Sequence, residues 1–226
     1  MPIAPTVDLR NQFGPVRDQG DRPTCLAFAA SDAHAALRGP WTALSCEFAF
    51  YHAQRRAGRP PTKGALLSHM LRTIKDDGQP IEDAWPYLNA LPADLDNYGP
   101  PSSVTVFRRN GEACPKAVDE VLAHLDDGRP VMVLMMISDS FYLPAVDGAI
   151  RAPAGKLPDP KRRHAVVAVG HGIADGHRAI LIRNSWGVGW GLQGYGWLTE
   201  PFLAPRLTAV ALLTEDLDVP TQNLAA

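Results

Sequence analysis

The spacing of apolar residues changes at a connector between residues 89 and 104, which holds Pro92, Pro100 and Pro101. Before it, stretches with the composition of helices predominate; after it come apolar runs short enough for single strands. This change predicts an α+β fold with a mainly helical lobe at 1–104, a β-rich lobe at 105–213 and a tail at 214–226. We expect the tail to be a flexible chain end.

Helix-start residues sharpen this division. Thr24 is a good N-cap for a helix that runs to Arg38, where Gly39 and Pro40 end it, and Ser45 can cap a second helix to about Arg56. Two more helices are expected at about 65–75 and 115–125. Strands are expected at 131–137, 165–169, 179–182 and 207–213.

Charge and composition exclude several classes of protein. The formal net charge is −2, and apolar residues make up 46% of the chain, as in ordinary globular proteins. Nothing in this balance favours a nucleic-acid or membrane partner, and no apolar stretch reaches the ~20 residues that cross a bilayer. No signal peptide is visible. Three cysteines, Cys25, Cys46 and Cys114, make a poor disulfide framework, so we expect a cytoplasmic protein.

Cys25 is the candidate nucleophile. It is the first residue of the predicted helix after Thr24, and a helix N-terminus stabilises a thiolate. Gln19 lies just upstream in a turn-rich stretch, and its amide can donate to a developing oxyanion beside the backbone N–H of Cys25. A buried, inert cysteine is the alternative for this residue.

His164 is the candidate base and Asn184 the candidate residue that orients it. Among the seven histidines, His164 alone opens an apolar run directly after a charged loop. Asn184 follows the apolar run 179–182, and its side-chain oxygen can fix the tautomer of His164, with Trp186 covering that hydrogen bond. Neither Cys-x-x-Cys nor His-x-x-x-His spacing occurs, so we expect no metal site and no cofactor.

Three sequence blocks, in this order, closely resemble those of papain-family cysteine peptidases. They are GPVRDQG and TCLAFA at 14–29, HAVVAVG at 164–170, and RNSWG continuing through WG and GYG at 183–196. The separation of Cys25 and His164 also falls in the interval of about 130–150 residues expected for that group. The resemblance spans roughly residues 7–213.

The resemblance implies a papain-like fold, with a helical lobe, an antiparallel β-barrel-like lobe and an active-site cleft between them. It implies that Cys25 is the nucleophile, His164 the base and acid, Asn184 the orienting residue and Gln19 the oxyanion donor. The implied substrate-binding residues are Gly64, Ala65, Leu66, Leu134, Ala165 and Trp186.

The chain also departs from the family pattern. Arg22 stands where the family usually has a second, disulfide-bonded cysteine, Pro23 replaces a glycine, and Leu26 replaces a tryptophan. We expect no long inhibitory pro-segment before Cys25. These departures indicate a disulfide-free intracellular branch without a pro-segment.

The expected activity is that of a cysteine endopeptidase acting through a thioacyl-enzyme on a peptide or protein substrate. Restraint is then expected from a separate protein inhibitor or a substrate-delivering partner. Two alternatives stay open at this point. One is another acyl transfer at the same site, by a transpeptidase, amidase or isopeptidase; the other is a catalytically silent peptide-binding module.

Overall fold

The computed structural model describes residues 3–153 and 158–218. Its helices are α1 (Cys25–Ala36), α2 (Cys46–Ala57), α3 (Leu67–Asp76), α4 (Val118–Asp126), α5 (Asp139–Tyr142) and α6 (Glu200–Leu203). Its strands are β1 (Pro5–Asp8), β2 (Arg109–Cys114), β3 (Val131–Met136), β4 (Ala149–Ile150), β5 (Arg163–Ala174), β6 (His177–Arg183), β7 (Tyr195–Thr199) and β8 (Leu207–Asp216). The predicted α+β class is confirmed.

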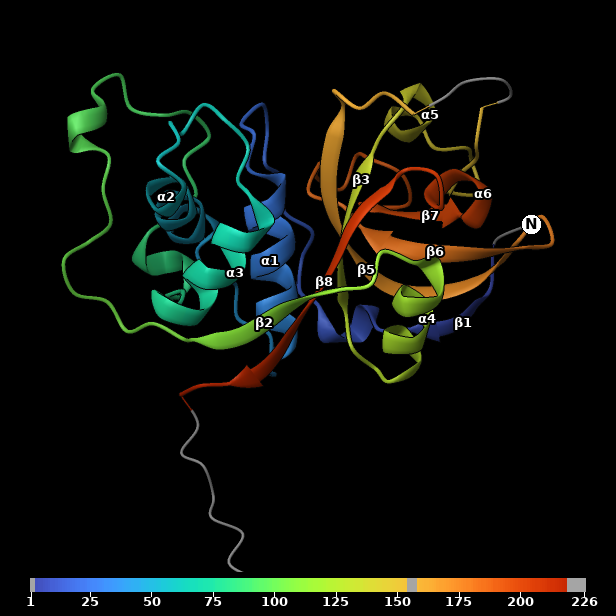
Figure 1. Ribbon diagram of the computed structural model, residues 1–226, viewed down its shortest axis with the longest axis horizontal. Helices are drawn as coiled ribbons and strands as arrows, with labels where there is room; N and C mark the ends of the chain where they lie inside the picture. Colours follow the sequence, from blue (N-terminus) through green and yellow to red (C-terminus); the bar gives the residue numbers. More distant parts are fainter. Residues whose placement is uncertain (1–2, 154–157, 219–226) are drawn as a thin grey trace, which may run out of the picture.

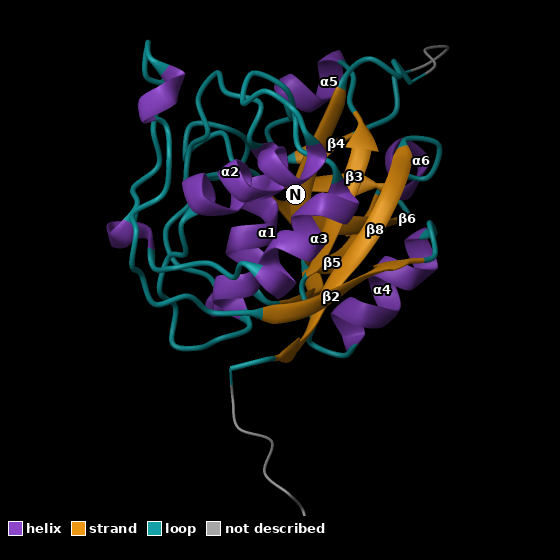
Figure 2. Ribbon diagram, turned by 60° about the vertical axis from the view of Figure 1, so that its left-hand side comes forward, coloured by secondary structure: helices purple, strands orange, loops and turns teal. Residues whose placement is uncertain are grey.

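The helices and the sheet occupy different parts of the molecule. Helices α1, α2 and α3 lie together on one side, and the strands on the other, with β2 running from beneath α3 toward α4 (Figure 1). In the turned view α4 and α6 lie beyond the strands, on the side away from α1–α3 (Figure 2). The sheet therefore has helices against both faces.

The sheet is open, which corrects the expectation of a β-barrel-like lobe. Its described strands follow the order β2-β8-β3-β5-β6-β7-β4, with β1 pairing separately to β5. All neighbours are antiparallel except β4 and β7. The long strand β5 accommodates three partners because β3 pairs with its first half and β1 with its second, while β6 pairs along its other edge.

The ends of the chain join the sheet more than the sequence suggested. Strand β1, from the region expected to form the helical lobe, pairs with β5 through Pro5 and Gly172. Strand β8 continues to Asp216, into the stretch 214–226 expected as a tail, and the Asp218 carboxylate binds the Arg108 guanidinium at 2.8 Å. Residues 219–226 of that stretch lie outside the described part of the chain. The lobe boundary at residue 104 stays a prediction.

Alternation along β5 builds two hydrophobic clusters. Ala165, Val167 and Val169 pack in the cluster shared with α1–α3. Val166 and Ala168 point to the opposite face and pack in the cluster shared with α4, α5 and α6. A strand buried on both faces is continuously apolar, which explains the uninterrupted apolar run 165–169.

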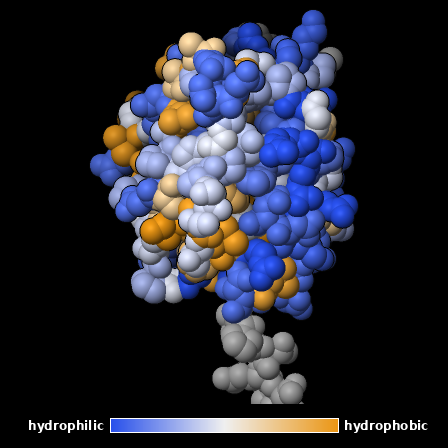
Figure 3. Space-filling view, turned by 90° about the vertical axis from the view of Figure 1, so that its left-hand side faces the viewer, coloured by the Kyte–Doolittle hydropathy of each residue, from blue (hydrophilic) through white to orange (hydrophobic). Residues whose placement is uncertain are grey.

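The outer surface fits this interior. The face of the helical lobe seen in Figure 3 is largely hydrophilic, and its apolar side chains form small separate patches. No helix among residues 3–153 and 158–218 combines the length and apolar character that a bilayer span needs.

Candidate active site

Cys25 is the first residue of α1, and it faces β5. Thr24 precedes it, but the predicted side-chain cap is wrong: the Thr24 hydroxyl lies 2.9 Å from the hydroxyl of Tyr87 instead. The first N–H groups of α1 are thus left without a side-chain cap. Burial raises the pKa of the Cys25 thiol, and hydrogen bonds from the backbone N–H groups of Ala165, Leu26 and Cys25 oppose this rise.

Burial acts against these N–H groups and is the larger effect. It raises the pKa of the Cys25 thiol above its ordinary value, whereas the helix N-terminus alone predicted a stabilised thiolate. Burial also lowers the pKa of His164 to about 4, opposed by its hydrogen bond to Asn184. At a pH between the pKa of His164 and that of Cys25, the two side chains together hold a single proton. In this protonation state the thiol can attack and the neutral imidazole can act as its base.

Asn184 holds the imidazole of His164. The His164 ring nitrogen Nε2 donates to the Asn184 Oδ1 at 2.7 Å, and both side chains are buried. The same oxygen accepts from the backbone N–H of Ser185 at 2.9 Å, which fixes the amide orientation. Because Nε2 is engaged by Asn184, the other ring nitrogen, Nδ1, is the one available to exchange a proton with a thiol.

Aromatic rings enclose the imidazole. The Trp186 ring lies 4.7 Å from the His164 ring, and the buried Phe141 ring meets the same imidazole edge-on at 5.5 Å. Tyr142 stacks on Trp186 at 5.2 Å. These rings keep water from the hydrogen bond between His164 and Asn184, and they explain the desolvation that lowers the pKa of His164. Trp186 was expected here from the sequence, while Phe141 and Tyr142 were missed because no motif marks them.

Gln19 is coupled to the Asn184 segment through Ser185. The Ser185 hydroxyl donates to the Gln19 Oε1 at 2.7 Å, and the Gln19 backbone N–H donates to the Ser185 carbonyl at 2.8 Å. The Gln19 Nε2 donates to the Arg22 carbonyl at 2.8 Å. An amide nitrogen carries two hydrogens, so Gln19 keeps one for another acceptor such as an oxyanion.

Arg22 stands where the family usually has a second cysteine, and its side chain forms a buried ion pair. Its two terminal nitrogens bind both carboxylate oxygens of Glu47 at 2.6 and 2.8 Å. Tyr98 and the backbone N–H of Leu88 also donate to Glu47. A two-point ion pair therefore connects the turn that presents Gln19 and Cys25 to α2.

The six predicted substrate-binding residues differ in their exposure and in their surroundings. Ala65, Leu134 and Ala165 share one hydrophobic cluster with Cys25, and Leu134 pairs directly with Ala165 across β3 and β5. Gly64 is exposed, with the Pro23 carbonyl nearby. Leu66 is 41% exposed at the start of α3, and Trp186 lies on the His164 side of the site.

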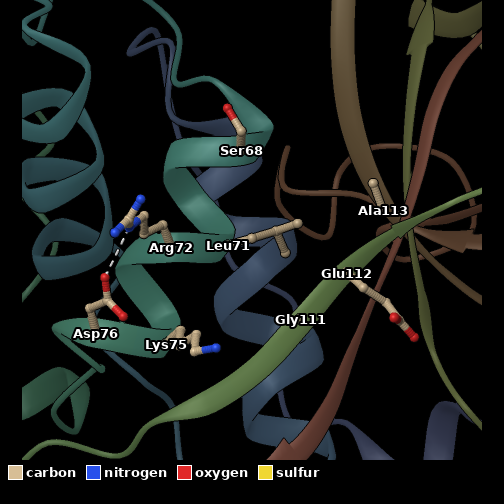
Figure 4. Close-up of a pocket in the computed structure, with 8 residues that line it drawn as sticks. All are labelled: Ser68, Leu71, Arg72, Lys75, Asp76, Gly111, Glu112 and Ala113. Carbon is tan, nitrogen blue, oxygen red and sulfur yellow. Dashed lines mark hydrogen bonds and ion pairs between the residues drawn. The ribbon is translucent and has the colours of Figure 1, made fainter.

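One surface groove adjoins the site and another lies apart from it. The first includes Trp186 and the exposed loop residues Leu143 and Val146. The second lies between α3 and β2, lined by residues such as Leu71, Lys75 and Glu112, and Figure 4 shows that none of its labelled residues belongs to the predicted site. The groove beside Trp186 therefore adjoins a ring that packs against the His164 imidazole.

Known protein families and sequences that are similar to this chain are cysteine proteases. A family model described as papain family cysteine protease matches residues 3–201. The chain is 27% identical over 195 residues to cysteine proteinase 1 of Entamoeba histolytica, covering 82% of this chain and 60% of that protein. It is 28% identical over 202 residues to a cathepsin L-like peptidase of Aedes aegypti, covering 85% of this chain and 58% of the peptidase. The chain thus spans at most about three fifths of these relatives.

Two solved structures share the fold. Xylellain, a cysteine protease from Xylella fastidiosa, superposes with a TM-score of 0.76 at 23% identity, covering 94% of this chain and 86% of that chain. Digestive procathepsin L 3 from the larval midgut of Tenebrio molitor gives a TM-score of 0.73 at 24% identity, covering 95% and 71% of the two chains. The papain-like fold expected from the sequence is confirmed.

Proposed function

The chain belongs to the papain family of cysteine proteases, and from this we propose that it is a cysteine endopeptidase, hydrolysing peptide bonds through a thioacyl-enzyme. The observation that carries the proposal is the buried 2.7 Å hydrogen bond between His164 and Asn184, with Cys25 at the start of α1 beside the Ala165 N–H. This arrangement provides a nucleophile, a base and an orienting group.

In the first half-reaction the Cys25 thiol gives its proton to the His164 Nδ1, and the sulfur attacks the carbonyl carbon of the scissile bond. The resulting oxyanion accepts hydrogen bonds from the free amide hydrogen of Gln19 and from the backbone N–H of Cys25. His164 then donates the proton to the leaving amine. The carbon–nitrogen bond breaks, and a thioester to Cys25 remains.

In the second half-reaction water replaces the amine. The water oxygen attacks the thioester carbonyl while His164 accepts a proton from the water. His164 then donates this proton to the departing Cys25 sulfur. The product is a free carboxylic acid, and the site regains its single shared proton. Asn184 keeps the imidazole ring in one orientation through both steps, because its oxygen holds the Nε2 hydrogen throughout.

The substrate is an extended peptide with an apolar side chain just before the scissile residue. Ala65, Leu134 and Ala165 belong with Cys25 to the hydrophobic cluster between α1–α3 and the sheet, which supports this preference. Leu66 would lie at the rim of that pocket, and the backbone at Gly64 would pair with the peptide. Residues beyond the scissile bond would lie along the groove beside Trp186.

The same proposal places the enzyme in a disulfide-free branch that works in the reducing cytoplasm. Cys25, Cys46 and Cys114 are free, and Arg22 and Glu47 form an ion pair where the family usually has a disulfide. The stretch before Cys25 contributes β1 to the sheet and Gln19 to the site, which argues that it is not a removable inhibitor. Restraint by a separate inhibitor or a substrate-delivering partner belongs to this proposal.

Cleavage profiling tests the proposal. The protein, kept under reducing conditions, is incubated with a diverse peptide library, and new termini are identified by mass spectrometry, with Cys25→Ala as the matched control. We expect internal cleavage with water as acceptor, even when an amine is added, and none in Cys25→Ala. Products formed only by transfer to the amine would indicate a transferase, and binding without products would indicate a silent module.

A further inference from the structure

Three side chains of different chemistry meet where β2 leads into α4. Cys114 is the last residue of β2, and Glu120 and His124 lie on α4. Their sulfur, carboxylate and imidazole atoms lie within 4.8 Å of one another. Among the described residues, these three are the cysteine, histidine and acidic side chains that lie close enough together to share an ion.

Local structure explains the meeting. A turn from Pro115 to Ala117 separates β2 from α4, with the Ala117 N–H donating to the Pro115 carbonyl at 2.9 Å, so Cys114 stays close to the helix. Glu120 and His124 are four residues apart and therefore lie on the same side of α4. The His124 Nε2 is 3.0 Å from the Glu120 Oε1.

We propose that Cys114, Glu120 and His124 bind a zinc ion. Cysteine sulfur, histidine nitrogen and glutamate oxygen are the ligand types that Zn²⁺ uses, while Mg²⁺ and Ca²⁺ require oxygen-only sets. Three protein ligands leave a fourth position for water. This set takes its members from a strand and a helix, so it has none of the Cys-x-x-Cys or His-x-x-x-His spacing typical of local zinc motifs.

The charges around the cluster favour a cation. Glu112 lies two residues before Cys114, so both side chains leave the same face of β2, and Figure 4 shows Glu112 turned away from α3. The carboxylates of Glu120 and Glu112 lie near Cys114, while the nearby Arg129 guanidinium is paired with Asp127 at 2.6 Å. A bound cation would offset this negative field and release the thiol proton.

His124 adds a second observation from hydrogen bonding. Its side chain is 15% exposed, and its Nδ1 is buried with no hydrogen-bond partner within residues 3–153 and 158–218. Buried polar atoms are normally satisfied, so Nδ1 is an exception on the same imidazole whose Nε2 faces the Glu120 carboxylate.

The position of the site indicates a structural role. Strands β8 and β3 lie between β2 and β5, the strand that carries His164, so the ion is separate from the catalytic residues. Strand β2 packs against α3 as well as β8 and leads directly into α4. A zinc ion would tie α4 to this crossing strand, and binding to the folded state alone would raise the melting temperature.

Zinc binding is measured directly in the Cys25→Ala protein, which removes the catalytic thiol as a competing ligand. The protein is titrated against a chromophoric zinc chelator with a phosphine reductant in place of a thiol. We expect one equivalent of Zn²⁺ to bind and the melting temperature to rise with zinc. Replacing zinc by Co²⁺ should give a thiolate-to-cobalt charge-transfer band in the near ultraviolet.

Variants assign the ligands. Added to the Cys25→Ala protein, Cys114→Ser and His124→Gln should each weaken zinc binding by about 100-fold or more, because loss of a direct ligand costs at least as much as loss of its supporting partner. His171→Gln is the matched control, since His171 pairs with Asp126 at 2.8 Å without a cysteine, and it should bind zinc normally. Absence of zinc binding, or binding and a charge-transfer band that survive in folded Cys114→Ser, would overturn the proposal.

Discussion

Asp32 and Arg183 form a buried ion pair that joins the nucleophile helix to the strand end carrying the orienting amide. The Arg183 Nε lies 2.6 Å from the Asp32 Oδ2, and Arg17 binds the other carboxylate oxygen at 2.5 Å. Asp32 lies on the helix that begins at Cys25, and Arg183 directly precedes Asn184. The pair therefore fixes the thiol relative to the group that holds the imidazole.

Asp32→Asn should destabilise the protein strongly, because it leaves the buried Arg183 guanidinium without a carboxylate and takes from Arg17 the nearer of its two carboxylates. Removing one partner of a buried pair costs about 3–5 kcal/mol of unfolding free energy. Urea unfolding measures this loss. Asp119→Asn is the control: Asp119 pairs with Arg178 on the surface, so its loss should cost about 1 kcal/mol or less. Equal effects of the two substitutions would contradict the role given to Asp32.

Gln19→Ala should lower kcat by on the order of 10²–10³, the usual effect of losing one oxyanion donor. The thiol itself should stay reactive, because Gln19 forms no hydrogen bond to Cys25 or His164 among those of the described residues. Steady-state kinetics are compared with the rate at which iodoacetamide alkylates Cys25. A parallel fall in both rates would mean that Gln19 only supports the fold.

The pH dependence of kcat/KM should be bell-shaped, because only the singly protonated pair of Cys25 and His164 can react. Burial lowers the pKa of His164 to about 4, so activity is lost as pH falls through about 4, where the imidazole becomes protonated. The alkaline limb should lie at higher pH than for an ordinary cysteine, because burial raises the pKa of the Cys25 thiol. Initial rates from pH 3 to 10.5 measure both limbs.

Asn184→Asp tests whether the pKa of His164 sets the acid limb of the pH profile of kcat/KM. A carboxylate in place of the amide favours the charged imidazole, so the pKa of His164 and the acid limb should both move to higher pH. An acid limb that does not move in this variant would mean that a group other than His164 controls it.

Leu134→Glu should change which substrates are cleaved. Leu134 is half-buried opposite Ala165, so a carboxylate there opposes apolar side chains before the scissile residue and favours basic ones. The ratio of kcat/KM for two peptides, with leucine or arginine at that position, measures the change. Leu143→Glu is the control, because Leu143 is 84% exposed on the other side of the site, and the ratio should not change.

Two predicted helix caps show how far local sequence determines local structure. Ser45 caps α2 as expected, because its hydroxyl accepts from the Phe48 N–H at 3.1 Å. Thr24 has an equally favourable residue type, but its hydroxyl bonds Tyr87, 63 residues away in the sequence. A cap depends on neighbours within four residues unless a distant partner competes, and such a partner is not visible in the local pattern.

Site features that depend on distant contacts were harder to predict. The motifs indicated Gln19, His164 and Asn184, but not Ser185 as the link between Gln19 and Asn184, because a hydroxyl next to an asparagine has no distinctive spacing. Phe141 and the ion pair between Asp32 and Arg183 depend on how β5, β6 and α1 pack. The expected closure of the sheet into a barrel-like lobe was also wrong. The alternation of side chains along a strand shows which face is buried, but it does not show which strands pair at the edges of the sheet.

Trapping the acyl-enzyme shows whether Cys25 is the nucleophile of an acyl transfer. The protein is mixed briefly with a peptide ester and quenched in acid. Its intact mass is measured, and the adduct is located by tandem mass spectrometry. We expect one acyl group on Cys25, none in Cys25→Ala, and a much slower appearance in His164→Ala. An acyl group on Cys114, or turnover that persists in Cys25→Ala, would contradict this expectation.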